Sequence, residues 1–267
     1  MSNVYYAPGE ARAAKVNDLF ARIARRYDLI NDLQSFGLHR NWKRRVAKLA
    51  RVAPGACALD LCCGTGDLAF ALAHRGADVT GLDFSPQMLE VAKGRGKKAE
   101  AGRQRSEIGG QRPEGGTQNR NSATPNSELR TPNFLQGDAL AAPFAEDTFD
   151  IVTVGYGLRN LASWERGLEE MRRVARPGGR IIVLDFGKPA NPWWRAMYFA
   201  HLKMSVPLIG LLFCGNASAY AYILESLKHY PAQLAVAEKM RELKLINVQV
   251  INLLGGAMAI NYGEKAG

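Results

Sequence analysis

Short apolar segments alternate with helical segments along the middle of the chain, and this alternation limits the possible folds more than any other feature. Helical patterns cover residues 67–74 and 163–175, and a third helix opens at Ser85-Pro86, which supply an N-cap and a first-turn proline. The pattern predicts a doubly wound α/β fold with a mainly parallel sheet, whose ligands bind at the carboxyl ends of the strands. The five expected strands lie at residues 57–62, 78–84, 134–140, 149–157 and 180–187.

Helical segments also precede this alternation and follow it. Apolar residues at helical spacing predict helices over 12–34 and about 39–51, which together form a cap in residues 1–52. Residues 188–230 are rich in aromatic and aliphatic side chains, yet no stretch reaches the roughly 18 uncharged apolar residues that span a bilayer. We therefore expect a helical lid over an apolar pocket.

The end of the chain completes the expected sheet. A helix over 232–243 precedes two apolar runs that are joined by Gly255-Gly256, which predicts a hairpin at the sheet edge. With these two strands the sheet has seven. A chain of 267 residues suits one decorated domain better than two independent ones, so we expect a single domain over residues 1–267.

The chain is basic, with a net charge of +10, and this charge suits a nucleic acid, an anionic membrane surface or an acidic substrate. Part of it lies in residues 39–45, which fall in an amphipathic helical stretch. Another part lies in residues 95–132, whose low apolar content predicts a disordered basic insertion. This segment lacks the interleaved aromatic residues that stack on bases, so we expect no nucleic-acid partner.

The cysteines give no sign of a metal site or of a disulfide framework. No C-x-x-C pair is present, and no histidine stands at a matching spacing. The first fifteen residues also lack the apolar run of a secretory signal. We expect a cytoplasmic protein whose thiols are buried; they belong to Cys57, Cys62, Cys63 and Cys214.

The segment ALDLCCGTGDLAF, residues 58–70, places a glycine-rich turn between a strand and a helix. Such turns bring backbone N–H groups close to a ligand, and G-T-G-D-L-A satisfies the loose dinucleotide pattern. However, no Lys-Ser/Thr pair follows, so the turn is not a P-loop. Asp60, before Gly64 and Gly66, would attract a sulfonium and repel a pyrophosphate.

Two further acids stand at the ends of the next two expected strands. Asp83 can accept both hydrogen bonds of a ribose diol, and Asp138 can lie near the exocyclic amine of an adenine. Together with Asp60 they describe a ligand with adenine, ribose and positive charge but no phosphate. S-adenosylmethionine fits this description.

Six motifs resemble the menaquinone/ubiquinone biosynthesis C-methyltransferase family, a class I S-adenosylmethionine-dependent family with a Rossmann-like fold. The resemblance covers nearly the whole chain outside residues 95–130. A general methyltransferase would share only the second and third motifs. The six are RYDLINDLQSFGLHRNWKRR at 26–45, LDLCCGTGDLA at 59–69, GLDFSPQML at 81–89, GYGLRN at 155–160, RPGGRIIVLDFGKPANP at 176–192 and the closing LLGGAMAINYGEK.

The resemblance implies methylation of a ring carbon on a polyprenylated quinol, either demethylmenaquinol or the methoxy-polyprenylbenzoquinol precursor of ubiquinone. The basic cap and the apolar lid favour a peripheral position at the inner face of an anionic membrane. The sequence leaves a homodimer open. Two positions depart from the family, because Leu254 and Asn261 stand where members often have threonine and histidine. Cofactor contacts are implied at Thr65, Asp83, Asp138, Ala139 and Gly155; the glycine turn adds Asp60, Gly64 and Gly66, and Tyr27 in the cap would close the site.

Ring methylation needs an electron-rich carbon, which a hydroquinone provides when a ring hydroxyl loses its proton. The site therefore needs a base or a group that stabilises an oxyanion. Tyr156, Arg159 and Asn160 in GYGLRN are the candidates for this catalytic role, with His39 and His201 as alternatives. The ring and part of the prenyl tail would be buried by the aromatic lid residues Trp193, Trp194, Tyr198, Phe199 and Phe213.

Other functions stay open on the sequence alone. Arg159 could instead pair with a carboxylate at a helix end while Asn160 caps the next turn. The positive charge would suit an RNA or DNA methyltransferase, but the Asn/Asp-Pro-Pro-aromatic motif of amino-group enzymes is absent where this chain has VGYGLRN. A dehydrogenase and a non-enzymatic interaction module are the remaining hypotheses.

Overall fold

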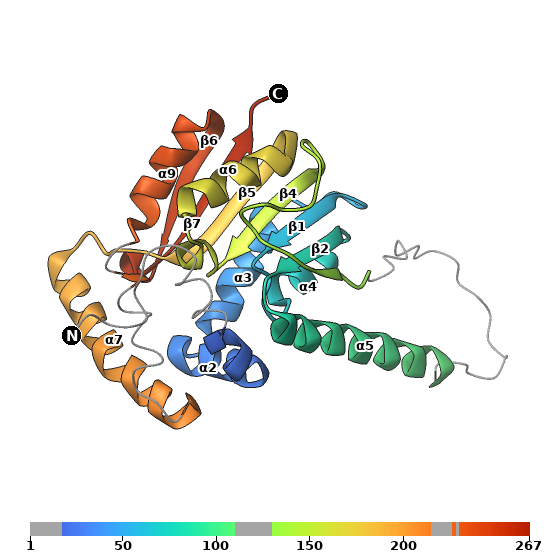
Figure 1. The fold of residues 1–267 in the computed structure, drawn as a ribbon, viewed down its shortest axis with the longest axis horizontal. Coiled ribbons are helices and arrows are strands. Elements are labelled where there is room, and N and C mark those ends of the chain that lie inside the picture. Colours follow the sequence, from blue (N-terminus) through green and yellow to red (C-terminus); the bar gives the residue numbers. More distant parts are fainter. Residues whose placement is uncertain (1–17, 110–129, 215–225, 228–229) are drawn as a thin grey trace, which may run out of the picture.

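The computed structural model describes residues 18–109, 130–214, 226–227 and 230–267. A seven-stranded sheet lies at its centre, in the order β3-β2-β1-β4-β5-β7-β6, and β7 runs antiparallel to both of its neighbours (Figure 1). The predicted doubly wound α/β fold and the seven strands are confirmed. The strands are β1 Cys57–Leu61, β2 Asp78–Asp83, β3 Asn133–Gln136, β4 Phe149–Gly155, β5 Ala175–Phe186, β6 Leu245–Leu253 and β7 Met258–Lys265.

Helices cover both faces of the sheet, because successive strand residues point to opposite sides. Ala58 packs in a cluster with side chains of α3 (Leu38–Leu49), α4 (Asp67–Ala73) and α5 (Pro86–Gly109). The next residue, Leu59, packs in a second cluster with side chains of α6 (Trp164–Val174) and α9 (Ala232–Glu242). The strands are therefore apolar on both faces, as expected of a parallel sheet between helices.

The N-terminal cap contains three short helical pieces where the sequence pattern predicted one helix over 12–34. Residues 18–23 are helical, a 3-10 turn η1 follows at Ala24–Arg26, and α2 covers Tyr27–Ser35. Residues 12–17 lie outside the described residues. The chain then turns into α3 through Phe36 and Gly37, both with positive φ, which a glycine adopts at little cost. The expected second cap helix is confirmed.

The prediction that disorder begins at residue 95 is wrong, because α5 extends to Gly109. Figure 1 shows this helix running past the edge of the sheet. Residues 97–107 consist mainly of Lys, Ala, Glu, Arg and Gln, which favour a helix even without an apolar face. Residues 110–129 of the proposed insertion lie outside the described residues.

The predicted lid contains α7, Pro192–Cys214, and η3 (Leu254–Gly256) joins β6 to β7 in the predicted edge hairpin. Leu202 and Val206 of α7 pack against Leu19, Ile23 and Ile30 of the cap. None of the described helices combines the length and the apolar character that a membrane span requires. Most of residues 215–230 lies outside the description.

The prediction of buried thiols is correct only for Cys63. Cys57, the first residue of β1, is exposed, and Cys62 is partly exposed. The side chain of Cys214 lies outside the description.

Candidate active site

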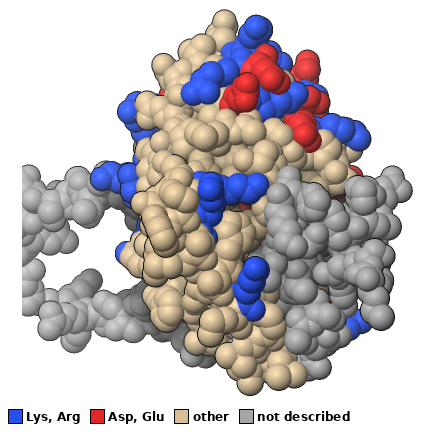
Figure 2. Space-filling model, turned by 90° about the vertical axis from the view of Figure 1, so that its left-hand side faces the viewer, with Lys and Arg blue, Asp and Glu red and all other residues tan. Residues whose placement is uncertain are grey.

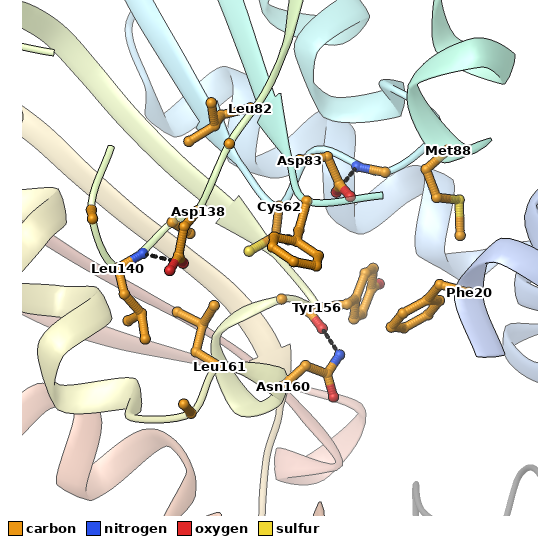
Figure 3. A pocket seen from close by; sticks show the side chains of 18 of the residues that line it. Phe20, Cys62, Leu82, Asp83, Met88, Asp138, Leu140, Tyr156, Asn160 and Leu161 are labelled. Carbon is orange, nitrogen blue, oxygen red and sulfur yellow. Dashed lines mark hydrogen bonds between the residues drawn. The ribbon is translucent and has the colours of Figure 1, made fainter. Parts of the chain in front are cut away.

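A cavity of about 700 Å³ opens at the carboxyl ends of β1, β2 and β4, where a doubly wound sheet binds its ligands. Figure 3 shows Asp138 on one side of it and Phe20 on the other, with Asp83 and Tyr156 between them. The structure therefore brings together most of the residues proposed from the sequence. Those that line the cavity are Tyr27, Gly64, Asp83, Asp138, Ala139, Gly155, Tyr156 and Asn160.

Asp83 is held by backbone donors on both carboxylate oxygens. The N–H of Gly64 donates to Oδ2 at 2.8 Å, and the N–H of Ser85 donates to Oδ1 at 2.9 Å. Burial raises the pKa of Asp83, while these N–H groups oppose that shift. Each oxygen keeps a lone pair for a further donor, so the carboxylate can accept two hydroxyl groups of a ligand.

Asp138 lies two residues beyond β3, where its Oδ1 accepts the N–H of Leu140 at 2.8 Å. It is more exposed than Asp83. Apolar side chains of Leu82, Met88 and Leu140 line the space around the two acids. The combination of two carboxylates with apolar walls suits a nucleoside better than a phosphate.

Three residues proposed as direct contacts lie behind the cavity wall. Asp60 is buried, accepts the hydroxyl of Thr153 at 2.8 Å and does not line the cavity. Burial raises its pKa to about 7, so the carboxyl group is only partly ionised at physiological pH. This argues against the prediction that Asp60 attracts the sulfonium. Thr65 is also buried and donates its hydroxyl to Asp28 at 2.7 Å. Gly66 has a positive φ, and a Cβ there would lie 2.7 Å from the ring of Phe134.

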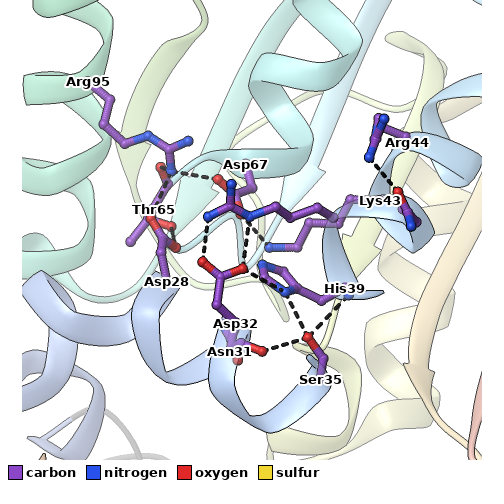
Figure 4. Close-up of polar contacts among 12 residues, drawn as sticks. Asp28, Asn31, Asp32, Ser35, His39, Lys43, Arg44, Thr65, Asp67 and Arg95 are labelled. Atoms are coloured by element: carbon purple, nitrogen blue, oxygen red, sulfur yellow. Dashed lines mark hydrogen bonds and ion pairs between the residues drawn. The ribbon is translucent and has the colours of Figure 1, made fainter. Parts of the chain in front are cut away.

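A network of charged side chains surrounds Thr65 of the glycine turn (Figure 4). Arg95 of α5 contacts Asp28 of α2 at 3.1 Å and Asp67 of α4 at 2.6 Å, and it donates to the carbonyl of Thr65 at 3.0 Å. Lys43 of α3 reaches the other oxygen of Asp67 at 2.7 Å. Burial would raise the pKa of Asp67, but Lys43 and Arg95 hold it at about 2. The turn is thus tied to four helices.

A second cavity of about 410 Å³ lies between α2, α3 and α7. Its walls are largely apolar, with Ile30, Trp42 and Leu202 among them. Trp194 and Tyr198 of the lid line it as predicted, whereas Trp193 is 83 % exposed and does not. That prediction failed because the two tryptophans are neighbours and point to different sides of α7.

The structure places the remaining residues of the lid and of the C-terminal segment in different surroundings. Phe199 packs against the helical cluster of the cap instead of lining the cavity, and the side chain of Phe213 lies outside the description. Leu254 lines the cavity, and its carbonyl accepts the indole N–H of Trp194 at 2.8 Å. Asn261 is buried and donates to the carbonyl of Gln233.

The two cavities share Phe20, Tyr27 and Tyr156 in their walls. Tyr156 has a φ of 63°, a conformation that a bulky residue rarely adopts and that often marks a functional site. Burial raises the pKa of Tyr156 well above its usual value and that of Tyr27 to about 12, so both are neutral phenols at physiological pH. A group bound in one cavity would meet a ligand of the other at these rings.

Arg159 faces the second cavity and forms a buried ion pair with Asp185 at the end of β5. Its Nε lies 3.2 Å from Oδ1 of Asp185, and its backbone N–H donates to Oδ2 at 3.1 Å. Nη1 also donates to the side chain of Asn160 at 2.7 Å, and the guanidinium lies 4.8 Å from the ring centre of Phe186. The alternative that Arg159 pairs with a carboxylate is therefore correct in part, since the partner ends a strand and not a helix.

Sequence reasoning missed the bracing residues Lys43 and Arg95 and the shared wall residue Phe20. The charge of Arg95 was assigned to an insertion, although Arg95 lies within α5, the helix that Ser85 opens. A helical period continued past residue 94 would have placed it on α5. Phe20 gave no signal beyond its apolar spacing in the cap.

The model of the ubiE/COQ5 methyltransferase family matches residues 9–108 and 117–265. A demethylmenaquinone methyltransferase of Desulfitobacterium hafniense (strain Y51) is 38% identical over 96% of this chain and 92% of its own length. One of Staphylococcus aureus (strain JH9) is 32% identical over 97% of this chain and 96% of its own. The crystal structure of a SAM-dependent methyltransferase from Aquifex aeolicus shares the fold, with a TM-score of 0.52, 14% identity and coverage of 83% and 88% of the two chains.

Proposed function

Because the chain belongs to the ubiE/COQ5 methyltransferase family and is an S-adenosylmethionine-dependent methyltransferase, we propose that it methylates a ring carbon of demethylmenaquinol. Two curated relatives that match nearly the whole chain carry the name demethylmenaquinone methyltransferase. The observation that carries the proposal is the apolar cavity between α2 and α7, which shares the wall residues Tyr27 and Tyr156 with the cavity at the strand ends.

The residues of the first cavity fit the cofactor. Asp83, with a free lone pair on each oxygen, would hold the ribose hydroxyls, and Asp138 with the apolar Ala139 would meet the adenine. At Gly64 and Gly155, the space that a Cβ would occupy is open, with no atom closer than 3.6 Å. The methionine part of the cofactor can therefore lie directly against the backbone at these two positions. When bound, the cofactor supplies an electrophilic methyl group on a sulfonium.

Asp60, Thr65 and Gly66 act on the cofactor indirectly in this proposal. Thr65 is bonded to Asp28, and Gly66 packs under the turn, so both shape the loop that presents Gly64. Asp60 fixes β1 to β4 through Thr153. The enzyme mainly aligns the reactants and excludes water, because the donor is already activated.

Arg159, Asn160 and Tyr156 would act on the ring of the acceptor. The buried guanidinium of Arg159 can stabilise negative charge that develops on a ring oxygen, and Asn160 orients it. Asn160 is itself fixed by donating to the carbonyl of Tyr156 at 3.1 Å. Tyr156 and Tyr27 stay protonated and can hold the ring between the two cavities without acting as bases.

The outer face of α7 would rest on an anionic membrane, where a prenylated substrate resides. Exposed apolar side chains such as Trp193, Met204 and Leu212 occur along a helix that contains no acidic residue. Arg195 and Lys203 add positive charge, each worth about 1 kcal/mol near such a surface. Figure 2, which views this side, displays Lys and Arg scattered on an otherwise uncharged surface while Asp and Glu gather at one end.

Vesicle binding tests this surface. We expect co-sedimentation with vesicles that contain phosphatidylglycerol and weak binding to pure phosphatidylcholine. The charge reversals Arg195→Glu and Lys203→Glu should weaken binding, whereas Lys93→Glu on exposed α5 should not. Equal binding of all variants to both vesicles contradicts the membrane proposal.

The proposed reaction is tested with methyl-labelled S-adenosylmethionine and three acceptors offered separately. These are chemically reduced demethylmenaquinol, the methoxy-polyprenylbenzoquinol and transfer RNA. We expect mass spectrometry to find the label on a ring carbon of the naphthoquinol. Label in RNA alone, or none in the naphthoquinol when calorimetry shows bound cofactor, contradicts the proposal; label in both quinols extends it to ubiquinone biosynthesis.

A further inference from the structure

His39 of α3, which the sequence offered as an alternative candidate for the catalytic role, is a buried histidine in the wall of the second cavity. It is 2 % exposed and lies across the cavity from α7. On the proposed function, this cavity holds the quinol ring. The ring must lose a hydroxyl proton before its carbon can accept a methyl group, and the groups considered above do not remove that proton.

The hydrogen bonds of His39 determine which ring nitrogen carries the proton. The hydroxyl of Ser35 has one hydrogen, which it donates to the carbonyl of Asn31 at 2.6 Å. Its oxygen therefore acts as an acceptor toward His39, from the backbone N–H at 3.2 Å and from Nδ1 at 2.9 Å. Nδ1 also lies 3.6 Å from Oδ1 of Asp32, which favours a proton on the same nitrogen. Nε2 is thus the basic nitrogen, and among the described residues it has no hydrogen-bond partner.

Burial, helped by two neighbouring cations, favours the neutral form of the His39 ring. Burial lowers its pKa, and the positive charges of Lys43 and Arg40 lower it further, while Asp32 and Asp67 act in the opposite direction. Arg159, His201 and the neutral tyrosines Tyr27, Tyr156 and Tyr198 also face the same cavity. A neutral imidazole with an available Nε2 is the form that accepts a proton.

The other titratable groups of this cavity suit the task less well. Tyr27, Tyr156 and Tyr198 have raised pKa values, so they donate hydrogen bonds and do not accept protons at physiological pH. An arginine does not give up its own proton. His201 is exposed on α7, where water competes for its nitrogens.

We propose that His39 is the general base of the reaction and that Ser35 and Asp32 hold its Nδ1–H so that Nε2 faces the acceptor. The O–H bond of the ring hydroxyl next to the accepting carbon breaks, its proton moves to Nε2, and its electron pair stays on oxygen. The ring carbon then forms its bond to the methyl carbon as the carbon–sulfur bond breaks. That carbon loses its hydrogen as a proton, and the imidazolium returns a proton to the oxygen, so one proton is released in total.

Nuclear magnetic resonance of the imidazole nitrogens tests the first half of the proposal without catalysis. In the full-length protein with ¹⁵N-labelled histidine, we expect His39 to be the Nδ1–H tautomer at pH 7. A proton on Nε2, or an imidazolium at that pH, overturns the proposal whatever the substrate is.

Single-turnover kinetics test the second half. His39→Gln should lower the methylation rate about 100-fold or more and remove the acidic limb of the pH profile, with cofactor affinity within threefold. The matched control is His74→Gln, since His74 is exposed on the far end of α4. Added imidazole should restore part of the rate in His39→Ala. An unchanged pH profile and rate in His39→Gln overturn the base role, while failure of the wild-type protein to methylate the quinol points to the proposed function instead.

Discussion

The buried pair of Arg159 and Asp185 makes a sharp test of the catalytic role of Arg159, provided that stability and turnover are separated. The side chains are 5 % and 3 % exposed and 3.2 Å apart. Arg159→Ala leaves the Asp185 carboxylate in a buried site without its cation. Removal of one partner of a buried pair costs about 3 to 5 kcal/mol, so we expect a large loss of stability whether or not Arg159 takes part in catalysis.

The double variant Arg159→Gln/Asp185→Asn removes both charges and keeps two amides that can hydrogen-bond. The double variant leaves no unpaired buried charge, so urea unfolding should show a smaller loss of stability than in Arg159→Ala. If Arg159 stabilises a ring oxyanion, the single-turnover rate should still fall about 100-fold, or about 2.7 kcal/mol in the barrier. Calorimetry should give a cofactor affinity within threefold of wild type. A stable double variant with a wild-type rate refutes the oxyanion role.

Three further predictions concern the cofactor side and the sheet beneath it. Asp83→Ala should weaken S-adenosylmethionine binding by about 2 kcal/mol in calorimetry, because a diol loses a charged acceptor; unchanged affinity removes Asp83 from the site. Arg95→Ala should weaken cofactor binding several-fold, because the turn at Thr65 loses a hydrogen bond. The control Lys97→Ala, at an exposed position of the same helix, should not change the affinity. Equal affinities of the two variants would contradict a role of Arg95 in holding the turn. Folding raises the pKa of Asp60 from 3.8 to about 7. Between these two pH values the folded state binds more protons than the unfolded state, so the free energy of unfolding falls as the pH rises. Asp60→Asn should therefore gain stability over wild type near pH 8 and lose that advantage near pH 4 in urea unfolding, and parallel pH profiles would contradict the shift.

The strand ends could be predicted from the sequence because parallel strands bring their carboxyl ends to one edge of the sheet. This reasoning correctly placed Asp83 and Asp138 in one cavity. It failed for Asp60, which shares the face of β1 with Ala58 and points between strand and helix toward Thr153 instead of outward.

Features formed by distant segments gave no local signal. The pairing of Arg159 with Asp185 depends on β4 and β5 ending side by side, and the orientation of His39 depends on the turn between α2 and α3. Composition was misleading for residues 95–109, where helix-forming charged residues were taken as disorder. Sequence patterns therefore predicted most helices and strands and the acids at the strand ends, but not which buried polar side chains contact each other.

A crystal structure with both S-adenosylhomocysteine and demethylmenaquinone bound tests the central claim most directly, namely that the two cavities hold donor and acceptor and meet at Tyr27 and Tyr156. The account predicts the ribose on Asp83, the quinone ring between α2 and α7, and the sulfur facing the ring at Tyr156. A quinone ring bound outside this cavity, or a nucleoside that does not contact Asp83, would contradict it.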